Sequence, residues 1–204
     1  MSVLPVLAGG QHRQPIIAAA IDLTAQSGWS AVTMSRLAEL VGVSRQTVYN
    51  EIGSKPALAE AMISHELRRF LAVVSAAFER HPDDLVEAIY DAVRAVLELA
   101  EDNILLRAIA SATHGTDNEF LPLLTTRAGT LLTEAKAVLR GRVRGYRPPL
   151  DEAQLTVAMD LVVRVVLSHV MQPSGTPAET ADGVAWVAAR VLGTAPAAPM
   201  RTRS

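Results

Sequence analysis

Apolar residues recur every three or four positions along almost the whole chain, and this spacing restricts the fold more than any other feature. One segment places Met34, Leu37, Ala38 and Val41 at i, i+3, i+4 and i+7, the spacing of a helix with one buried face. The alternation of apolar and polar residues that marks a half-buried strand is almost absent. We therefore predict an all-α protein of about nine helices.

Glycines and cap residues divide these helices into two groups. Gly28, Gly42 and Gly53 each end a short helix, and Ser54 can cap a long helix that begins at Lys55. We predict an N-terminal domain of three short helices over residues 11–54 and a larger helical bundle over residues 55–194. A short sixth helix is expected between Asn103 and Gly115.

Composition excludes several classes of protein. The sequence has no cysteine, so disulfides, zinc–thiolate sites and iron–sulfur clusters are excluded. The formal net charge of −2 excludes a globally basic surface but leaves room for a local basic face. The uncharged run 165–178 is shorter than the roughly 20 residues that a bilayer requires. We expect a cytoplasmic protein with no membrane partner and no cofactor.

The histidines give no sign of an enzyme. None of the five forms a His-Glu-x-x-His or Glu-x-x-His motif, and the chain has no Gly-rich phosphate loop. Asp160, Ser168 and His169 lie on one predicted helix, where their spacing prevents them from converging as a catalytic triad. We therefore expect no enzymatic activity.

The segment from Thr33 to Asn50 carries the most specific pattern. It reads as a helix, a tight turn at Gly42 and a second short helix capped by Ser44. The residues with the spacing to pack the two helices together are Leu37, Ala38, Val43 and Val48. The exposed side of the second helix then carries side chains that can read base edges or hold phosphates, namely Arg45, Gln46, Thr47, Tyr49 and Asn50.

This stretch resembles the DNA-binding domain of TetR-like (tetracycline-repressor-like) transcriptional regulators. The residues that carry the resemblance are Thr33, Leu37, Ala38, Val41-Gly42-Val43-Ser44, Thr47-Val48-Tyr49 and Gly53-Ser54-Lys55. The resemblance implies base and phosphate contacts from Arg45, Gln46 and Thr47. It also implies phosphate contacts from Tyr49, Lys55, Thr33 and Ser35. Without the resemblance, the pattern is equally consistent with an ordinary polar helix-turn-helix corner that does not bind DNA.

Two features depart from the expected pattern. Ile52 stands where many members have Phe, and Glu51 stands where many have an aromatic residue or histidine. Glu51 either turns away, toward Arg45 or Lys55, or accepts a hydrogen bond from a cytosine amine. Four basic and four acidic residues make residues 1–60 neutral, so we expect a shallow dependence of DNA affinity on salt.

The helix expected near residues 150–171 is apolar on more than one face, so it needs more than one packing partner. We predict that it pairs with the last helix in a homodimer, as the resemblance also implies. A two-fold dimer would place two recognition helices on a palindromic double-stranded DNA operator. The expected interface residues are Val157, Leu161, Val165, Val184, Ala188 and Val191.

Members of the family usually hold a small effector among the middle helices, and the resemblance implies the same here. We expect a mostly apolar ligand with one or two polar anchors. The candidate lining residues are Phe70, Phe78, Leu106, Ile109, His114, Phe120, Leu124 and Met159.

The sequence thus predicts a ligand-responsive transcriptional regulator, with repression as the family default. A helical ligand carrier or interaction protein with a degenerate helix-turn-helix is the alternative, favoured by the neutral N-terminal domain and by Glu51. A basic cluster forms a second possible nucleic-acid surface, although a solvated helix end is the simpler interpretation. Its members are Lys136, Arg140, Arg142, Arg144 and Arg147.

Overall fold

The computed structural model describes residues 10–103, 106 and 121–193, and of residues 121–132 it describes the backbone alone. Across this part of the chain there are eight α-helices, one short 3-10 helix and no strand. The prediction of an all-α fold is confirmed. The short helix expected between Asn103 and Gly115 lies outside the described residues.

The chain packs as two compact units. Of the described residues, the first unit contains 10–66 and the first turns of α7 (Leu121–Arg144). The second contains Leu67–Asn103 and residues 128–193. The division by packing falls within α4 (Lys55–Arg80), whose first turns belong to the N-terminal unit. The domain boundary that we expect between residues 54 and 55 stays a prediction.

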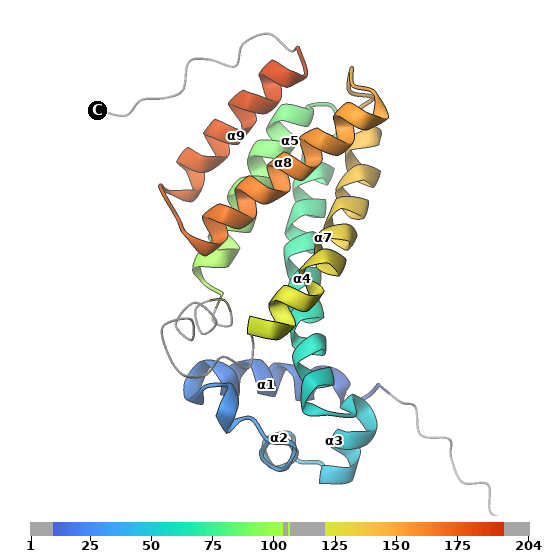
Figure 1. Cartoon of the computed structure of the whole chain (residues 1–204), viewed down its shortest axis with the longest axis vertical. Coiled ribbons are helices and arrows are strands. Elements are labelled where there is room, and N and C mark those ends of the chain that lie inside the picture. The colour runs from blue at the N-terminus through green and yellow to red at the C-terminus, as the bar shows by residue number, and fades with distance from the viewer. Residues whose placement is uncertain (1–9, 104–105, 107–120, 194–204) are drawn as a thin grey trace, which may run out of the picture. The chain divides into compact units, whose positions relative to one another are not determined.

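The N-terminal unit is built from short helices around one small core (Figure 1). They are α1 (Arg13–Ser27), the 3-10 helix η1 (Trp29–Ala31), α2 (Met34–Val41), α3 (Arg45–Ile52) and the start of α4. Each helix contributes apolar side chains to the centre, and burial of these side chains stabilises helices that are too short to persist alone. The largest fully buried residues are Ile16, Ile17, Val32, Leu37, Val48, Leu58 and Met62.

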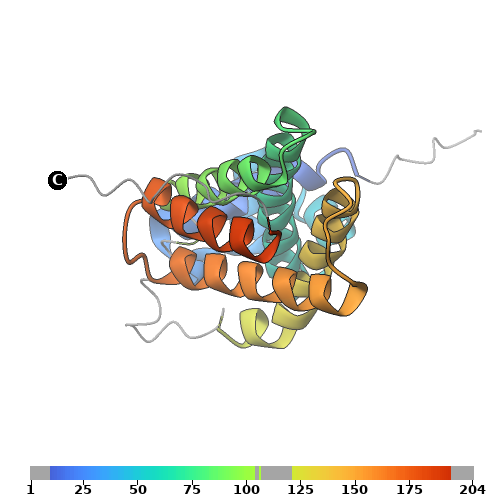
Figure 2. The same ribbon diagram turned by 90° about the horizontal axis from the view of Figure 1, so that it is seen from above.

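The second unit contains the rest of α4, α5 (Leu85–Glu101), the later turns of α7, α8 (Glu152–Met171) and α9 (Pro177–Val191). One apolar cluster joins α4, α5, α7 and α8 around Phe78 and Met159. A second joins α5, α8 and α9 around Leu97 and Ala181. Both views show α8 and α9 side by side (Figures 1 and 2).

Polar side chains define where the C-terminal helices begin. The Asp151 side chain caps α8 and the Thr176 side chain caps α9, and each is part of a complete capping box with the residue three positions later. Pro177 follows at the first turn of α9, where its missing N–H costs nothing. These caps fix the residues at which α8 and α9 begin.

A polar cluster joins the end of α4 to α5 and to the turn after α7. Arg80 donates from Nε and Nη2 to Asp91 Oδ2 over 2.9 and 2.7 Å, and His81 Nε2 lies 3.1 Å from the same oxygen. The Tyr146 hydroxyl lies 3.0 and 2.7 Å from the carbonyl oxygens of Phe78 and His81. Tyr146 also packs edge-on against the Phe78 ring, so the cluster closes one end of the unit.

We expect the Asp91 contacts to make stability depend on pH. Partial burial acts to raise the pKa of Asp91, but hydrogen bonds from Arg80 and His81 outweigh it and hold the pKa below its ordinary value of 3.8. The stabilisation is therefore present above the unfolded-state pKa and is lost as pH falls through the lower folded-state pKa. Asp91→Asn should lower the free energy of unfolding by about 1 kcal/mol at pH 7.

Urea unfolding of the wild-type chain and Asp91→Asn between pH 7 and pH 3 would check this. The difference in free energy of unfolding between the two proteins should shrink as the pH falls below about 4. A difference that stays constant over that range would contradict the assigned role of the carboxylate. Glu98→Gln, which changes an exposed carboxylate on the same helix, is the matched control.

Candidate functional site

The turn between α2 and α3 is fixed by backbone hydrogen bonds and by one left-handed residue. Gly42 has φ +73° and ψ +34°, a conformation that costs a non-glycine residue about 1 kcal/mol or more. The N–H of Val43 donates to the carbonyl of Ala38 over 3.0 Å and closes the end of α2. Ser44 then caps α3 by accepting from the N–H of Thr47 over 3.0 Å. The expected helix-turn-helix is present.

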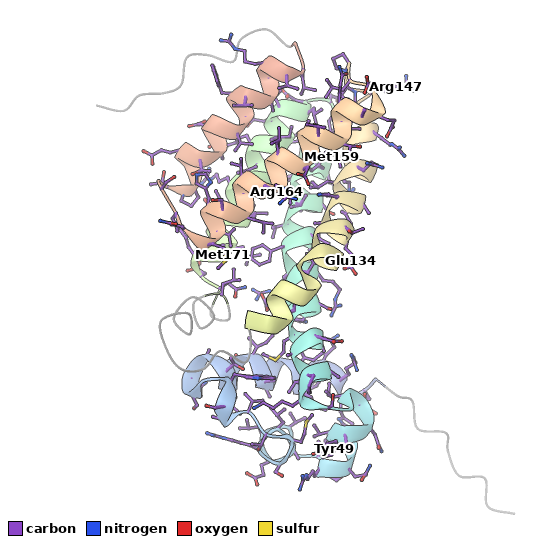
Figure 3. The ribbon with its side chains drawn as sticks, viewed as in Figure 1. Tyr49, Glu134, Arg147, Met159, Arg164 and Met171 are labelled. Carbon is purple, nitrogen blue, oxygen red and sulfur yellow. The ribbon has the colours of Figure 1, made fainter. Side chains whose placement is uncertain are left out.

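Burial of one side of α3 determines which residues face outward. Val48 is fully buried and Ile52 nearly so, and both belong to the core that contains Leu37 and Ala38. Val43 packs against the same core, so the expectation that Leu37, Ala38, Val43 and Val48 pack the two helices together is confirmed. The side chains of Arg45, Gln46, Tyr49 and Asn50 are exposed and that of Thr47 is half-exposed. Tyr49 is labelled on α3 in Figure 3.

The outward side chains of α3 contact one another one turn apart. Arg45 Nη2 donates to the Tyr49 hydroxyl over 3.3 Å, and the guanidinium carbon lies 5.4 Å from the Tyr49 ring centroid. Gln46 Nε2 donates to Asn50 Oδ1 over 2.9 Å. The Thr47 hydroxyl lies 2.9 Å from Ser44 Oγ. All five predicted residues of α3 are therefore gathered on one polar surface.

The other predicted DNA-contacting residues begin the neighbouring helices. Thr33 caps α2 by accepting from the N–H of Arg36 over 3.2 Å, and Ser35 is exposed in the first turn of that helix. Lys55 is the first residue of α4, and its ammonium lies 4.8 Å from the ring centroid of the buried Trp29. This cation–π contact holds the charge near the start of α4.

In the structure Glu51 turns toward the start of α1 rather than toward Arg45 or Lys55, and its contact with a cytosine amine stays a prediction. Its carboxylate oxygen Oε1 accepts from the N–H of Gly10 over 3.2 Å, and its main-chain carbonyl accepts from Arg13 Nη1 over 2.5 Å. Arg13 thus donates to a carbonyl in the last turn of α3. A positive charge at the C-terminal end of a helix also interacts favourably with the helix dipole. The contacts join the beginning of α1 to the end of α3.

Sequence analysis missed the roles of Trp29 and Arg13. Both act on residues far away in the chain, and no spacing pattern links position 29 to position 55 or position 13 to position 51. Trp29 reads in the sequence as an ordinary core residue. Its ring lies under Lys55 only because the 3-10 helix places it there.

Most members of the basic cluster at the end of α7 pair with neighbouring polar side chains. Arg140 Nη2 donates to Thr156 Oγ1 over 2.8 Å, and Arg144 Nη2 to Glu152 Oε1 over 2.9 Å. Lys136 pairs with Asp160, which also accepts from Arg164, and Arg142 pairs with Glu79 of α4. These contacts tie α7 to α8 and α4, which favours a structural role over a second nucleic-acid surface.

The outer faces of α8 and α9 are apolar and exposed. Val157 and Leu161 are each 59% exposed, Val165 is 40% exposed, and Val191 is 49% exposed. Trp186 and Val187, which we did not predict, extend this surface on α9. Val184 is half-buried against the cluster of α5, α8 and α9, and Ala188 is buried, so these two expected interface residues pack within one chain.

Among the described helices, α8 is long and apolar enough to meet the criteria for a membrane span. Length and composition alone are weak evidence for one. Its buried side packs against α5 and α7, whereas Arg164 lies exposed beside Leu161 and Val165 on the outer side. An apolar face interrupted by an arginine is more typical of a protein–protein contact than of a lipid-facing helix.

The predicted effector residues are only partly described. Phe78 and Met159 are buried members of the α4–α5–α7–α8 core, and Phe70 and Leu106 are half-buried. Ile109, His114 and Phe120 lie outside the described residues, and the side chain of Leu124 does too. No group of three or more metal-ligating side chains is present in the described part of the chain.

Comparison with protein families identifies both halves of the chain. Residues 16–62 match the family described as bacterial regulatory proteins of the tetR family. Residues 84–190, more than half of the chain, match the bacterial tetracyclin repressor C-terminal domain. The chain belongs to the TetR family. It is a TetR-family transcriptional regulator, and the family resemblance of the Thr33–Asn50 segment is confirmed.

Individual relatives agree with this assignment. The HTH-type transcriptional regulator AlkX of Mycobacterium tuberculosis is 28% identical over 79% of this chain and 75% of its own length. The crystal structure of the TetR-family repressor AlkX from Dietzia sp. strain DQ12-45-1b, implicated in biodegradation of n-alkanes, covers 88% of this chain and 96% of its own. That match has a TM-score of 0.71 and 28% identity. FadR of Bacillus halodurans, a fatty acid degradation regulator, shares the fold with a TM-score of 0.57 and 20% identity over 91% of this chain and 97% of its own.

Proposed function

We propose that this TetR-family regulator is a repressor that binds a palindromic operator as a homodimer and is released by a small, mostly apolar effector. The observation that carries the proposal is the polar surface of α3. A capped helix buries Val48 and Ile52 and presents Arg45, Gln46 and Asn50 outward. A helix of this kind can enter the major groove, which is wide enough to admit it.

The residues of the DNA surface are proposed to divide into two groups. Arg45, Gln46 and Asn50 reach base edges from the exposed side of α3. Phosphates are held from three helices, by Thr33 and Ser35 of α2, by Thr47 and Tyr49 of α3, and by Lys55 at the start of α4. Lys55 adds its charge to the N–H groups at a helix start, which favour an anion.

Fluorescence anisotropy of the purified chain on its own upstream intergenic DNA tests this function. We expect binding that unrelated competitor DNA does not remove. Lys55→Gln should weaken binding to every sequence, whereas Gln46→Ala should weaken it mainly on the operator. Since Lys55 is the one cationic phosphate contact proposed in each subunit, the slope of log K against log salt for the dimer should be about −2.

A helical carrier with a degenerate helix-turn-helix is the alternative, and it predicts no sequence-specific binding. Enrichment of genomic fragments on the immobilised chain extends the test to operators that lie elsewhere in the genome. Failure to enrich any fragment would contradict the proposed regulator. Since the proposed partner is chromosomal DNA, we place the protein in the cytoplasm.

The proposed dimer uses the outer faces of α8 and α9. Val157, Leu161 and Val165 lie on one side of α8, and Val187 and Val191 extend the apolar surface on α9. Exposed apolar surface of this extent is unfavourable in water and becomes stabilising once a second copy covers it. We assign the apolar character of α8 to this contact, with no membrane partner.

Leu161→Glu should convert the dimer into a monomer. In a two-fold interface the substitution buries two unpaired carboxylates, at a cost of several kcal/mol, which raises the dimer dissociation constant at least about a hundredfold. Leu161 is exposed in the single chain, so the variant should fold. Light scattering at micromolar concentration measures the result.

Leu40→Glu is the matched control, because Leu40 is also 59% exposed but lies on α2. This variant should stay dimeric. A wild-type chain that is monomeric, or a Leu161→Glu variant that is still dimeric, would contradict the proposed interface.

The proposed effector is a linear aliphatic molecule that binds among the middle helices. The similarity to a repressor implicated in n-alkane biodegradation supports this chemical class. Within the second unit, the expected lining is apolar and includes Phe70, Phe78 and Met159. The ligand would favour the arrangement that binds DNA poorly and so lower the affinity for the operator.

Titration of the protein–operator complex with n-hexadecane, palmitic acid and resorcinol checks the effector class. We expect an aliphatic compound to lower operator affinity by about 5- to 150-fold, the usual range of allosteric coupling, and the aromatic diol to leave it unchanged. Release by resorcinol alone would contradict the assignment. Release by neither aliphatic compound would also contradict it.

A further inference from the structure

Two pairs of side chains on α3 hold each other in the absence of DNA. Arg45 is bound by the hydroxyl and the ring of Tyr49, and Gln46 is bound by the amide oxygen of Asn50. Each pair is separated by four residues, so its members lie one above the other on the helix surface. These contacts reduce the number of rotamers that Arg45 and Gln46 sample before they meet DNA.

The contact with Asn50 determines which groups Gln46 presents outward. One hydrogen of Gln46 Nε2 is donated to Asn50 Oδ1, which leaves one N–H donor and the Oε1 acceptor. A donor beside an acceptor is complementary to the N7 acceptor and N6 donor of adenine in the major groove. The donor and the acceptor that remain on Gln46 therefore match the two groups that adenine offers.

Arg45 presents only donors, because a guanidinium has no acceptor, and the contact with Tyr49 occupies one of them. One N–H of Nη2 is donated to the Tyr49 hydroxyl, and the remaining guanidinium N–H groups can still form a two-pronged contact. Guanine offers two acceptors, O6 and N7, on its major-groove edge, and a paired donor set matches it better than any other base. The Tyr49 hydroxyl retains its own hydrogen, which it can donate to a phosphate.

We propose that each operator half-site contains a guanine bound by Arg45 and an adenine bound by Gln46 in neighbouring base pairs. Besides their own proposed contacts with DNA, Tyr49 and Asn50 position Arg45 and Gln46. Arg45 and Gln46 are consecutive at the start of α3, so they address neighbouring base pairs. This inference rests on the proposed binding of a DNA operator and assigns the sequence that it recognises.

The experiment is selection of bound sequences from a random duplex library by the full-length chain, followed by the same selection with single variants. The wild-type consensus should contain the guanine and adenine in each half-site. Gln46→Glu should replace adenine by cytosine at one position, because a carboxylate accepts from the cytosine N4 amine. Arg45→Lys should reduce the guanine preference about tenfold or more, because lysine lacks the planar fork.

Variants of the positioning residues give a readout that a merely structural role would not change. Asn50→Ala should reduce the adenine preference several-fold, while Tyr49→Phe, which keeps the ring but removes the hydroxyl, should reduce the guanine preference. Glu39→Gln, an exposed change on α2 outside the polar surface, should leave the consensus unchanged.

The outcomes distinguish failure of the proposed function from failure of the base assignment. Failure of the wild-type chain to enrich any sequence would contradict the proposed function itself. A clear consensus that does not change with Gln46→Glu or Arg45→Lys would overturn the base assignment alone. A consensus that responds to those two variants but not to Asn50→Ala or Tyr49→Phe would overturn the positioning roles.

Discussion

The burial of Val48 and Ile52 is the interaction on which the DNA surface depends. An isolated helix as short as α3 is unstable in water, because nucleation costs more than so few hydrogen bonds return. Two apolar side chains in the N-terminal core, the Ser44 cap and the Gly42 turn hold it in place. Since this burial fixes the rotation of the helix about its axis, it also decides which polar residues face outward.

In the second unit, by contrast, the single chain leaves apolar side chains exposed on α8 and α9. Leu155, Met159 and Val163 of α8 enter the interior, whereas Val157 and Leu161 stay exposed on the other side. A helix surrounded by its own chain would bury both faces. Packing of the inward side chains against α5 and α7 fixes this arrangement, and the exposed surface is the basis for the proposed dimer.

Hydrogen bonds and ion pairs from arginines join helices at the edges of the apolar clusters. Arg140 and Arg144 of α7 each meet α8, and Arg13 meets the last turn of α3. The sequence correctly indicated that the basic residues of α7 gather at a helix end. Their partners were not predictable from the sequence. A long side chain can reach several acceptors, and the packing of the helices decides which of them lies close enough.

In the described part of the chain, the sequence alone determined the α-helices, the turn at Gly42 and the outward residues of α3. These depend on local spacing, caps and backbone conformation, which are readable within one or two turns. Tertiary structure decided the contacts of Trp29 with Lys55 and of Glu51 with Gly10, and the burial of Ala188. Such contacts join distant segments, and their geometry follows from how the helices pack rather than from any periodic pattern.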